Sequence, residues 1–209
     1  MLTLTFARHG ETDYNAQGRV QGRGIDSDLN ARGRLQAARL AARLADQPFE
    51  AVYTSSMRRT QQTAAPLLAA RPELAPVALD DLDEMHWGVY EGRGAGPDLR
   101  EQYARYVDAW TGGDFELAVE GGESPHDVER RAVRAVDAIR EAHGAGDVLV
   151  VTHGRLLRVL LASLLPAYTL HRMQDLTHGN TALSVVEFGP DGARARVLND
   201  TRHLDGLPA

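Results

Sequence analysis

The chain has 209 residues, with hydrophobic residues at 43% and charged residues at 25%, values typical of a globular protein and not of a disordered or fibrous one. It contains no cysteine and no lysine, which excludes disulfides, thiolate metal sites, cysteine nucleophiles, lysine Schiff bases and the P-loop lysine. The net charge of -6 argues against nucleic acid or an anionic membrane as the main partner.

The N-terminal residues form a short apolar run. Residues 1–6 are too few for the apolar region of a signal peptide and carry no positive flank. No stretch of the sequence approaches the ~20 apolar residues that a membrane-spanning helix needs. We therefore expect a cytoplasmic protein without a membrane partner, and we interpret the first residues as a buried strand.

Strand-like and helix-like segments alternate over the first third of the chain. Residues 2–6 are rich in β-formers, and residues 31–45 combine Ala and Leu with spaced arginines, as an amphipathic helix does. A second short strand is predicted at 51–54. It leads into a helical stretch at 58–70, which we expect to stop before Pro72.

The segment 88–122 differs in amino-acid composition from the residues that precede it. Glycines, acids and aromatic residues dominate, and no strand pattern is visible. We interpret it as a cap-like insertion packed over one end of the sheet, with its aromatic residues in packing roles.

A second series of elements follows the insertion. Ser124, with Asp127 three residues later, forms a capping-box pattern at the start of a predicted helix. Residues 148–151 are a continuous apolar run of the kind found in central parallel strands. Residues 156–165 are predicted as a helix that ends at Pro166.

The last predicted elements are two strands, 183–188 and 193–198, which flank a Gly-Pro-Asp-Gly turn as in a hairpin. No internal repeat or low-complexity tract is visible. The whole pattern predicts one α/β domain over 1–209, a three-layer sandwich with a mostly parallel central sheet and helices on both faces.

Histidines directly follow two of the predicted strands. Arg8 and His9 come after the first strand, His153 comes after the run at 148–151, and Arg58 lies near the end of the second strand. Ligands of open α/β sheets bind at the carboxyl ends of the strands, so we expect these side chains to share one edge. Guanidinium groups bind phosphate oxygens through a planar fork, and a neutral imidazole can attack phosphorus. The sequence therefore predicts an anion site, most naturally for a phosphoryl group.

Five motifs stand in order along nearly the whole chain, each with a suitable strand context. They are Arg-His-Gly-Glu-Thr at 8–12, Ser-Ser-Met-Arg-Arg-Thr-Gln-Gln-Thr-Ala at 55–64, Asp-Glu at 83–84 before Trp-Gly-Val-Tyr-Glu-Gly at 87–92, Gly-Gly-Glu-Ser at 121–124 and Val-Thr-His-Gly at 151–154. Together they resemble the histidine phosphatase superfamily, which has the phosphoglycerate mutase-like fold.

The resemblance implies a role for each main site residue. His9 would be the nucleophile that accepts the phosphoryl group as a phosphohistidine. Arg8, Arg58 and His153 would hold the phosphate oxygens. Glu84 would protonate the leaving oxygen and then, as a carboxylate, deprotonate the attacking water. The resemblance implies neither a metal nor another cofactor.

Further positions match the pocket of the family. Asn15, Gln21, Gly22 and Gly154 are expected to contact substrate or phosphate. We expect Arg59, next to Arg58, to be solvated or paired in a salt bridge. Surface or loop roles are expected for the other histidines, with His86 close enough to Glu84 to line the pocket; they are His86, His126, His143, His171, His178 and His203.

The leading functional hypothesis is a cofactor-independent phosphomonoesterase that hydrolyses small phosphorylated metabolites through a phosphohistidine. A phosphoglycerate mutase uses the same site, but Thr12, the pair Gln21-Gly22 and the modest length of the insertion resemble the phosphatase branch more closely. A non-catalytic phosphoester-binding protein is the alternative from another class. A metal-dependent hydrolase is disfavoured because no His-x-x-x-His pattern or acidic cluster accompanies the histidines. The oligomeric state stays open, with a homodimer as one alternative.

Overall fold

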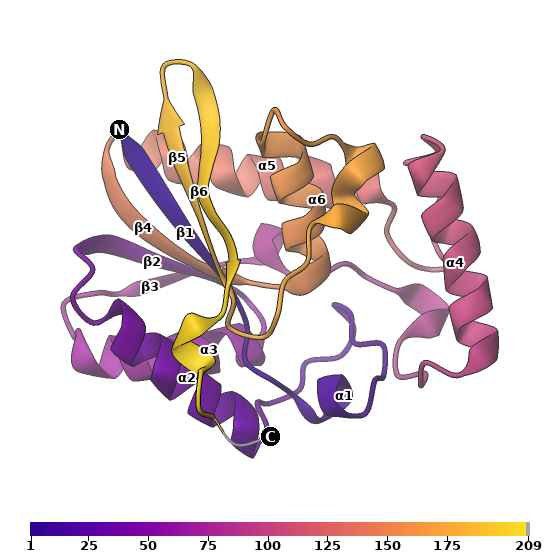
Figure 1. Cartoon of the computed structure of the whole chain (residues 1–209), viewed down its shortest axis with the longest axis horizontal. Helices are drawn as coiled ribbons and strands as arrows, with labels where there is room; N and C mark the ends of the chain where they lie inside the picture. Colours follow the sequence, from indigo (N-terminus) through magenta and orange to yellow (C-terminus); the bar gives the residue numbers. More distant parts are fainter. Residues whose placement is uncertain (208–209) are drawn as a thin grey trace.

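The computed structural model describes residues 1–207 and centres on a six-stranded sheet with the strand order β3-β2-β4-β1-β5-β6 (Figure 1). The first four strands in this order are parallel, and β5 and β6 form an antiparallel hairpin beside β1. The strands are β1 (Leu2–Arg8), β2 (Phe49–Ser55), β3 (Pro76–Leu79), β4 (Gly146–Thr152), β5 (Leu183–Gly189) and β6 (Gly192–Asp200). The predicted α/β class with a mostly parallel sheet is confirmed.

Helices cover both faces of the sheet. The helices are α1 (Asp13–Ala16), α2 (Ala31–Leu44), α3 (Arg58–Ala70), α4 (Pro97–Thr111), α5 (Pro125–Ala142) and α6 (Gly154–Leu164). Short 3-10 turns lie at η1 (Asp80–Leu82), η2 (Gly88–Tyr90), η3 (Leu170–Asp175) and η4 (Arg202–Leu204). Two of the helices flanking the sheet, α2 and α3, pack against each other, and α5 packs against α6.

Side-chain alternation along β4 explains the three layers. Val148 and Val150 belong to the hydrophobic core that contains α5 and α6, whereas Leu149 and Val151 belong to the core that contains α2 and α3. Successive residues of a strand point to opposite faces, so a continuous apolar run is what a strand buried on both sides requires. This arrangement also brings the residues that follow β1 and β4 to the same edge of the sheet.

The insertion after η1 contains a helix that its glycine-rich sequence did not predict. The helix α4 begins with Pro97 in its first turn and buries Leu99 and Trp110. These two side chains join the same core as Trp87 and Tyr90, so the aromatic residues pack as expected. Figure 1 places α4 at the right, on the side of the molecule toward which β1 runs.

The edge strand β3 was also not predicted. It is only four residues long, and the first three of them are exposed, so the pattern lacks the alternation of a half-buried strand. Val77 within it is 44% exposed.

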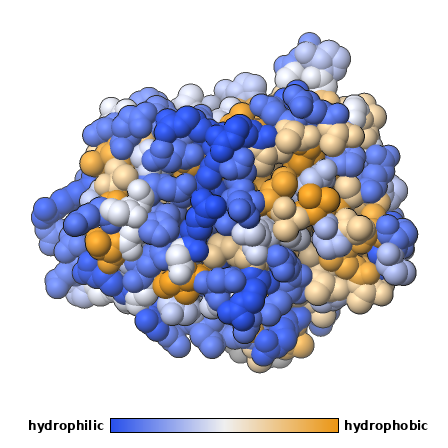
Figure 2. Space-filling view, turned by 180° about the vertical axis from the view of Figure 1, so that it is seen from behind, coloured by the Kyte–Doolittle hydropathy of each residue, from blue (hydrophilic) through white to orange (hydrophobic). Residues whose placement is uncertain are grey.

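The view from behind shows a largely hydrophilic surface with hydrophobic residues gathered toward one side (Figure 2). Within residues 1–207, no helix is both long and apolar enough to cross a bilayer.

Candidate active site

Two buried histidines lie side by side where β1 and β4 end. These strands are parallel neighbours in which Arg8 pairs with Thr152, so the residues that follow, His9 and His153, emerge together. Their ring centroids are 5.2 Å apart, and the residues are 3% and 0% exposed. The structure therefore brings together the two histidines that the sequence placed at one sheet edge.

The His9 ring is held in one tautomer by the backbone. Its Nδ1 lies 2.7 Å from the carbonyl oxygen of Gly10. A carbonyl can only accept, so Nδ1 carries the proton, and in the neutral ring Nε2 keeps a free lone pair. Burial, with the guanidiniums of Arg59 and Arg8 adding to it, holds the pKa of His9 well below its usual range. His9 is therefore a neutral imidazole with an available Nε2, the form that a nucleophile requires.

Arg8 presents a donor that the protein leaves unused. Its Nη1 donates to the carbonyl of His178 at 2.8 Å, while its Nε is buried without a hydrogen-bond partner. A Cβ on Gly154 would lie 3.1 Å from this Nε, so glycine lets the guanidinium approach the start of α6 closely. Because buried donors are normally paired, the unpartnered Nε–H is suited to bind an anionic oxygen, and a phosphate oxygen has the required charge.

The structure places Arg59, and not Arg58, beside the two histidines, so Arg59 is not the solvated or salt-bridged residue that the sequence suggested. Arg59 is 0% exposed, and its Nε donates to His153 Nδ1 at 3.2 Å. The side chain of Arg58 is instead 55% exposed and forms ion pairs with Asp26 at 3.3 Å and Asp28 at 3.1 Å.

The position of each residue around helix α3 explains why Arg59 is buried and Arg58 is exposed. The buried residues of α3 are Arg59, Thr60, Thr63, Ala64 and Leu67. Residues four positions apart share one face of a helix, so Arg59 lies on the same buried face as Thr63 and Leu67. A motif alone leaves the two adjacent arginines ambiguous, and the orientation of α3 against the sheet decides between them.

The His153 ring is fixed through both of its nitrogens. Its Nδ1 accepts from Arg59, and its Nε2 lies 2.7 Å from Ser55 Oγ. Because a guanidinium only donates, the neutral ring carries its proton on Nε2 and donates it to Ser55. Burial and, after it, the charge of Arg59 hold the pKa of His153 well below its usual range. Its position at the N-terminus of α6 adds to the positive potential at this edge.

Glu84 supplies the negative charge next to the two arginines. Its carboxylate accepts from the backbone N–H groups of Met85 at 2.9 Å, Arg155 at 3.1 Å and Leu156 at 3.0 Å. The last two belong to the first turn of α6, so Glu84 caps this helix. The carboxylate raises the pKa of Arg59, opposing the burial that lowers it to about 10. At neutral pH Arg59 therefore stays a cation beside Glu84.

The residues expected to contact substrate hold the surrounding loops in this structure. Asn15 Oδ1 accepts from the Thr12 backbone N–H at 3.2 Å, and Gln21 Oε1 accepts from the Thr12 hydroxyl at 2.7 Å. The Gly22 carbonyl accepts from Arg59 Nη2 at 3.3 Å. A Cβ on Gly22 would lie 2.8 Å from the Met85 carbonyl oxygen, so the backbone leaves no room for a side chain in this turn. All three thus shape the first loop and the position of Arg59.

Sequence reasoning missed the loop that precedes β5. The Asn180 side chain donates to the His9 carbonyl at 3.1 Å and to Asn15 Oδ1 at 3.2 Å. His178, expected in a surface or loop role, is 7% exposed. This loop reaches the site because β5 pairs antiparallel with β1, so residues before β5 lie next to residues after β1. The available signal was the polar run His-Gly-Asn-Thr at 178–181 directly before a strand.

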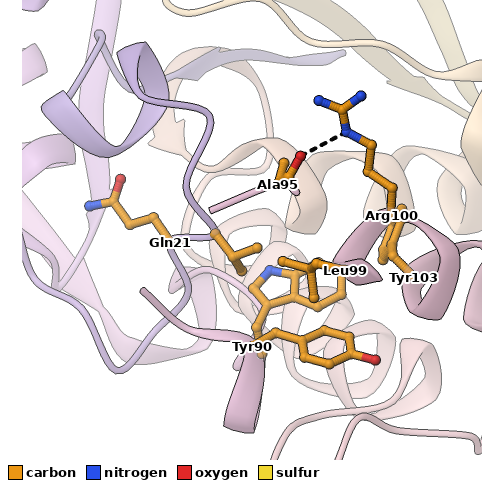
Figure 3. Close-up of a pocket in the computed structure, with 8 residues that line it drawn as sticks. Gln21, Tyr90, Ala95, Leu99, Arg100 and Tyr103 are labelled. Carbon is orange, nitrogen blue, oxygen red and sulfur yellow. Dashed lines mark hydrogen bonds between the residues drawn. The ribbon is translucent and has the colours of Figure 1, made fainter. Parts of the chain in front are cut away.

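An apolar cavity of about 260 Å³ lies between the first loop and the cap helix α4. Its lining includes Val20, Gln21, Trp87, Leu99 and Tyr103, with Arg100 and Tyr90 also at its wall (Figure 3). The Arg100 Nε donates to the Ala95 carbonyl at 2.8 Å within this group. Gln21, in the wall of this cavity, accepts from the hydroxyl of Thr12, which ends the Arg-His-Gly-Glu-Thr motif.

Known proteins of the same kind share both sequence and fold with this chain. It is 36% identical over 212 residues to the metal-independent phosphoserine phosphatase of Arabidopsis thaliana, covering 98% of this chain and 84% of the relative. It is 34% identical to GpmB of Yersinia pestis (strain Pestoides F), described as a probable phosphoglycerate mutase, covering 100% of this chain and 97% of the relative. The structure of Bacillus stearothermophilus YhfR matches with a TM-score of 0.86 at 30% identity, over 98% of this chain and 100% of that one.

The family itself is matched over nearly the full sequence. Residues 4–201 match the histidine phosphatase superfamily (branch 1). This span contains both histidines, Arg8, Arg59 and Glu84, and the matching structures share the phosphoglycerate mutase-like arrangement expected from the motifs. The chain therefore belongs to the histidine phosphatase superfamily.

Proposed function

We propose that the chain is a metal-independent phosphomonoesterase that hydrolyses small phosphorylated metabolites through a phosphohistidine on His9 Nε2. The observation that carries the proposal is the state of His9: it is buried and neutral, its Nδ1–H donates to the Gly10 carbonyl, and the guanidiniums of Arg59 and Arg8 lie close by. Phosphoryl transfer needs positioning and neutralisation of charge more than covalent assistance, and Arg8 and Arg59 supply both.

In the first step the phosphate monoester is held by Arg8 and Arg59, and His9 Nε2 attacks phosphorus in line with the leaving oxygen. The N–P bond forms as the P–O bond to the alcohol breaks. The ring becomes cationic in this step, and the Gly10 carbonyl that accepts from Nδ1–H stabilises the new charge. The departing oxygen takes the proton that Glu84 carries at the start of this step, which leaves Glu84 as a carboxylate for the second step.

In the second step water attacks the phosphohistidine while the Glu84 carboxylate takes a proton from it. The N–P bond breaks, inorganic phosphate leaves, and His9 returns to its neutral form. Glu84 has the capacity for this role, because a carboxylate offers about four lone-pair positions and three are occupied by backbone N–H groups. The remaining position can carry the transferred proton.

The relative described as a probable phosphoglycerate mutase supports one alternative, in which a substrate hydroxyl replaces water as the acceptor. The same buried His9 would serve both reactions. The two are separated by products: a phosphatase releases inorganic phosphate, whereas a mutase interconverts phosphoglycerates. Incubation with 3-phosphoglycerate and 2,3-bisphosphoglycerate, followed by product analysis, decides between them, and we expect inorganic phosphate to accumulate.

The direct test is phosphate release from p-nitrophenyl phosphate in EDTA, measured for the wild type, His9→Ala and the matched control His171→Ala. His171 is exposed and contacts the Thr111 carbonyl, away from the buried pair. We expect activity in EDTA for the wild type and the control, and none for His9→Ala. Normal turnover by His9→Ala, or loss of wild-type activity in EDTA, would overturn the proposal.

A further inference from the structure

Arg131 and Glu123 form an ion pair beneath the loop that carries Glu84. The Arg131 Nε lies 2.8 Å from Glu123 Oε1, and its Nη2 lies 2.9 Å from Glu123 Oε2, so the contact is bidentate. Arg131 is buried and Glu123 is mostly so. Burying an ion pair costs desolvation, which good geometry and further hydrogen bonds must offset. Glu123 also belongs to the Gly-Gly-Glu-Ser motif at 121–124, which the proposed chemistry does not use.

Arg131 uses its remaining donors on the backbone next to Glu84. Its Nη1 donates to the carbonyls of Asp81 at 3.0 Å and Asp83 at 2.6 Å, and its Nη2 donates to the Glu84 carbonyl at 3.1 Å. A guanidinium has five N–H groups, so these three bonds and the two to Glu123 occupy all of them. Arg131 is therefore committed entirely to this loop and to its partner carboxylate.

Glu123 holds the same loop on the other side of Glu84. Its Oε2 accepts from the His86 backbone N–H at 2.8 Å, and its own backbone N–H donates to the His86 carbonyl at 2.8 Å. A Cβ on Gly122 would lie 2.7 Å from that carbonyl oxygen, so glycine permits the close approach of the two backbones. Arg131 and Glu123 together fix the backbone before, at and after Glu84.

The loop needs such support because residues 83–87, between η1 and η2, lie outside any helix or strand. Backbone groups of an irregular segment depend on partners from elsewhere in the fold. The Glu84 carboxylate accepts from the first turn of α6, whereas its backbone is bound by Arg131 on α5. Because α5 packs against α6, the two ends of Glu84 are held by two helices that are fixed relative to each other.

We propose, on the basis of the proposed function, that Arg131 and Glu123 are positioning residues for proton transfer by Glu84. The pair sets the place of the Glu84 backbone and, through it, the place of the carboxyl group that protonates the leaving oxygen. A misplacement of about 1 Å can lower the rate of a catalysed step about 10²-fold. A pair with only a structural role would affect stability or all substrates alike, whereas a positioning pair affects the substrates that need the proton.

Two esters of nearly the same shape, p-nitrophenyl phosphate and phenyl phosphate, differ in this need. Nitrophenolate leaves without an acid, whereas phenolate is the more basic leaving group and depends on a proton from Glu84. The value of kcat/KM covers the reaction from free enzyme and substrate to the first irreversible step, which is release of the phenol. The ratio of kcat/KM for phenyl phosphate to that for p-nitrophenyl phosphate therefore measures proton transfer to the leaving oxygen.

The ratio is measured in EDTA for two mild variants, a control and Glu84→Gln, each shown by thermal unfolding to be folded at the assay temperature. Arg131→Lys keeps the positive charge but replaces five fixed donors by three, and Glu123→Gln keeps the shape but removes the charge. The control is Arg134→Lys on the same helix, where the side chain is 63% exposed and pairs with Asp81.

We expect the ratio to fall about tenfold or more in Arg131→Lys and Glu123→Gln, and to stay unchanged in Arg134→Lys. Glu84→Gln combined with Arg131→Lys should give the ratio of Glu84→Gln alone, because both changes act through the same group. An unchanged ratio in either folded variant, or a further fall in the combined variant, would overturn the proposal. General damage to the site would lower kcat/KM for both esters and leave the ratio in place.

Amide hydrogen exchange measures the position of Glu84 without turnover. The Leu156 N–H donates to Glu84 Oε1 at 3.0 Å, whereas the next amide, Leu157, donates to the His153 carbonyl at 3.0 Å and serves as an internal reference. We expect exchange at Leu156, relative to Leu157, to be about tenfold faster in Arg131→Lys. Unchanged relative exchange would overturn the proposal. Hydrolysis of neither ester by the wild type would contradict the proposed function, whereas the exchange at Leu156 still decides whether the pair positions Glu84.

Discussion

Replacing Arg59 by Gln, with Arg58→Gln as the matched control, separates the buried arginine from its exposed neighbour. Arg59 donates to His153, to the Ile25 carbonyl at 2.8 Å and to the Gly22 carbonyl at 3.3 Å. A guanidinium has five N–H donors, so two remain for a bound phosphoryl group. The guanidinium of Arg58 instead donates to Asp26, and its side chain is largely exposed.

The expected fall in kcat/KM of Arg59→Gln follows from the loss of these two donors. Hydrogen bonds to charged groups contribute about 1.5–3 kcal/mol each, so losing two removes about 3–6 kcal/mol of transition-state stabilisation. At about 1.4 kcal/mol per factor of ten, kcat/KM falls roughly 10²- to 10⁴-fold in Arg59→Gln. Surface ion pairs such as those of Arg58 contribute about 0–1 kcal/mol to stability, and Arg58→Gln should keep kcat/KM within about twofold.

The assay is steady-state hydrolysis of p-nitrophenyl phosphate, with thermal unfolding to confirm that both variants are folded at the assay temperature. Equal losses in the two variants, or a larger loss in Arg58→Gln, would refute the assignment of Arg59 to the phosphate site.

Three further predictions concern proton transfer, buried histidines and packing. Glu84→Gln should lower kcat by about 10²–10⁴ while the affinity for inorganic phosphate, measured by calorimetry, stays similar; an unchanged kcat would move the proton-transfer role elsewhere. The lowered pKa values of His9, His153 and His178 mean that the unfolded chain binds more protons below about pH 6.5, so the free energy of unfolding should fall as pH drops from 7 to 5. His178→Gln should reduce that slope by up to about 1.4 kcal/mol per pH unit in denaturant titrations, and an identical slope would contradict a neutral buried His178. In Gly33→Ala the new Cβ would meet the Glu11 carbonyl oxygen at 2.0 Å, so a loss of about 1–3 kcal/mol is expected on chemical unfolding, and a neutral effect would contradict this close approach.

Local sequence patterns were sufficient to predict most of the fold and to place His9 and His153 at one edge of the sheet. The apolar run at 148–151 identified a central strand because only burial on both faces requires such a run. Once β1 and β4 are parallel neighbours, the rule that ligands bind at strand carboxyl ends brings His9 and His153 together. The capping box at Ser124 and Asp127 likewise marked the start of α5, because both of its reciprocal hydrogen bonds are local.

What could not be predicted depends on contacts distant in sequence or on helix phase. Arg58 and Arg59 are equivalent in composition, and only the rotation of α3 against the sheet decides which of them is buried. His178 and Asn180 enter the site through the antiparallel pairing of β5 with β1, which no local pattern specifies. The edge strand β3 owes its conformation to pairing with β2, since its exposed residues carry no alternation.

The most direct test of the central claim is to trap the phosphoenzyme with p-nitrophenyl phosphate that carries a radioactive phosphoryl group. The nitrophenolate leaves without help from an acid, so Glu84→Gln should still be phosphorylated, while its hydrolysis is slowed by loss of the general base. We predict a covalent label that survives alkali, is lost in acid, maps to the peptide containing His9 and is absent when His9→Ala is added to the same variant. A label on another residue, or one that persists without His9, would contradict the account.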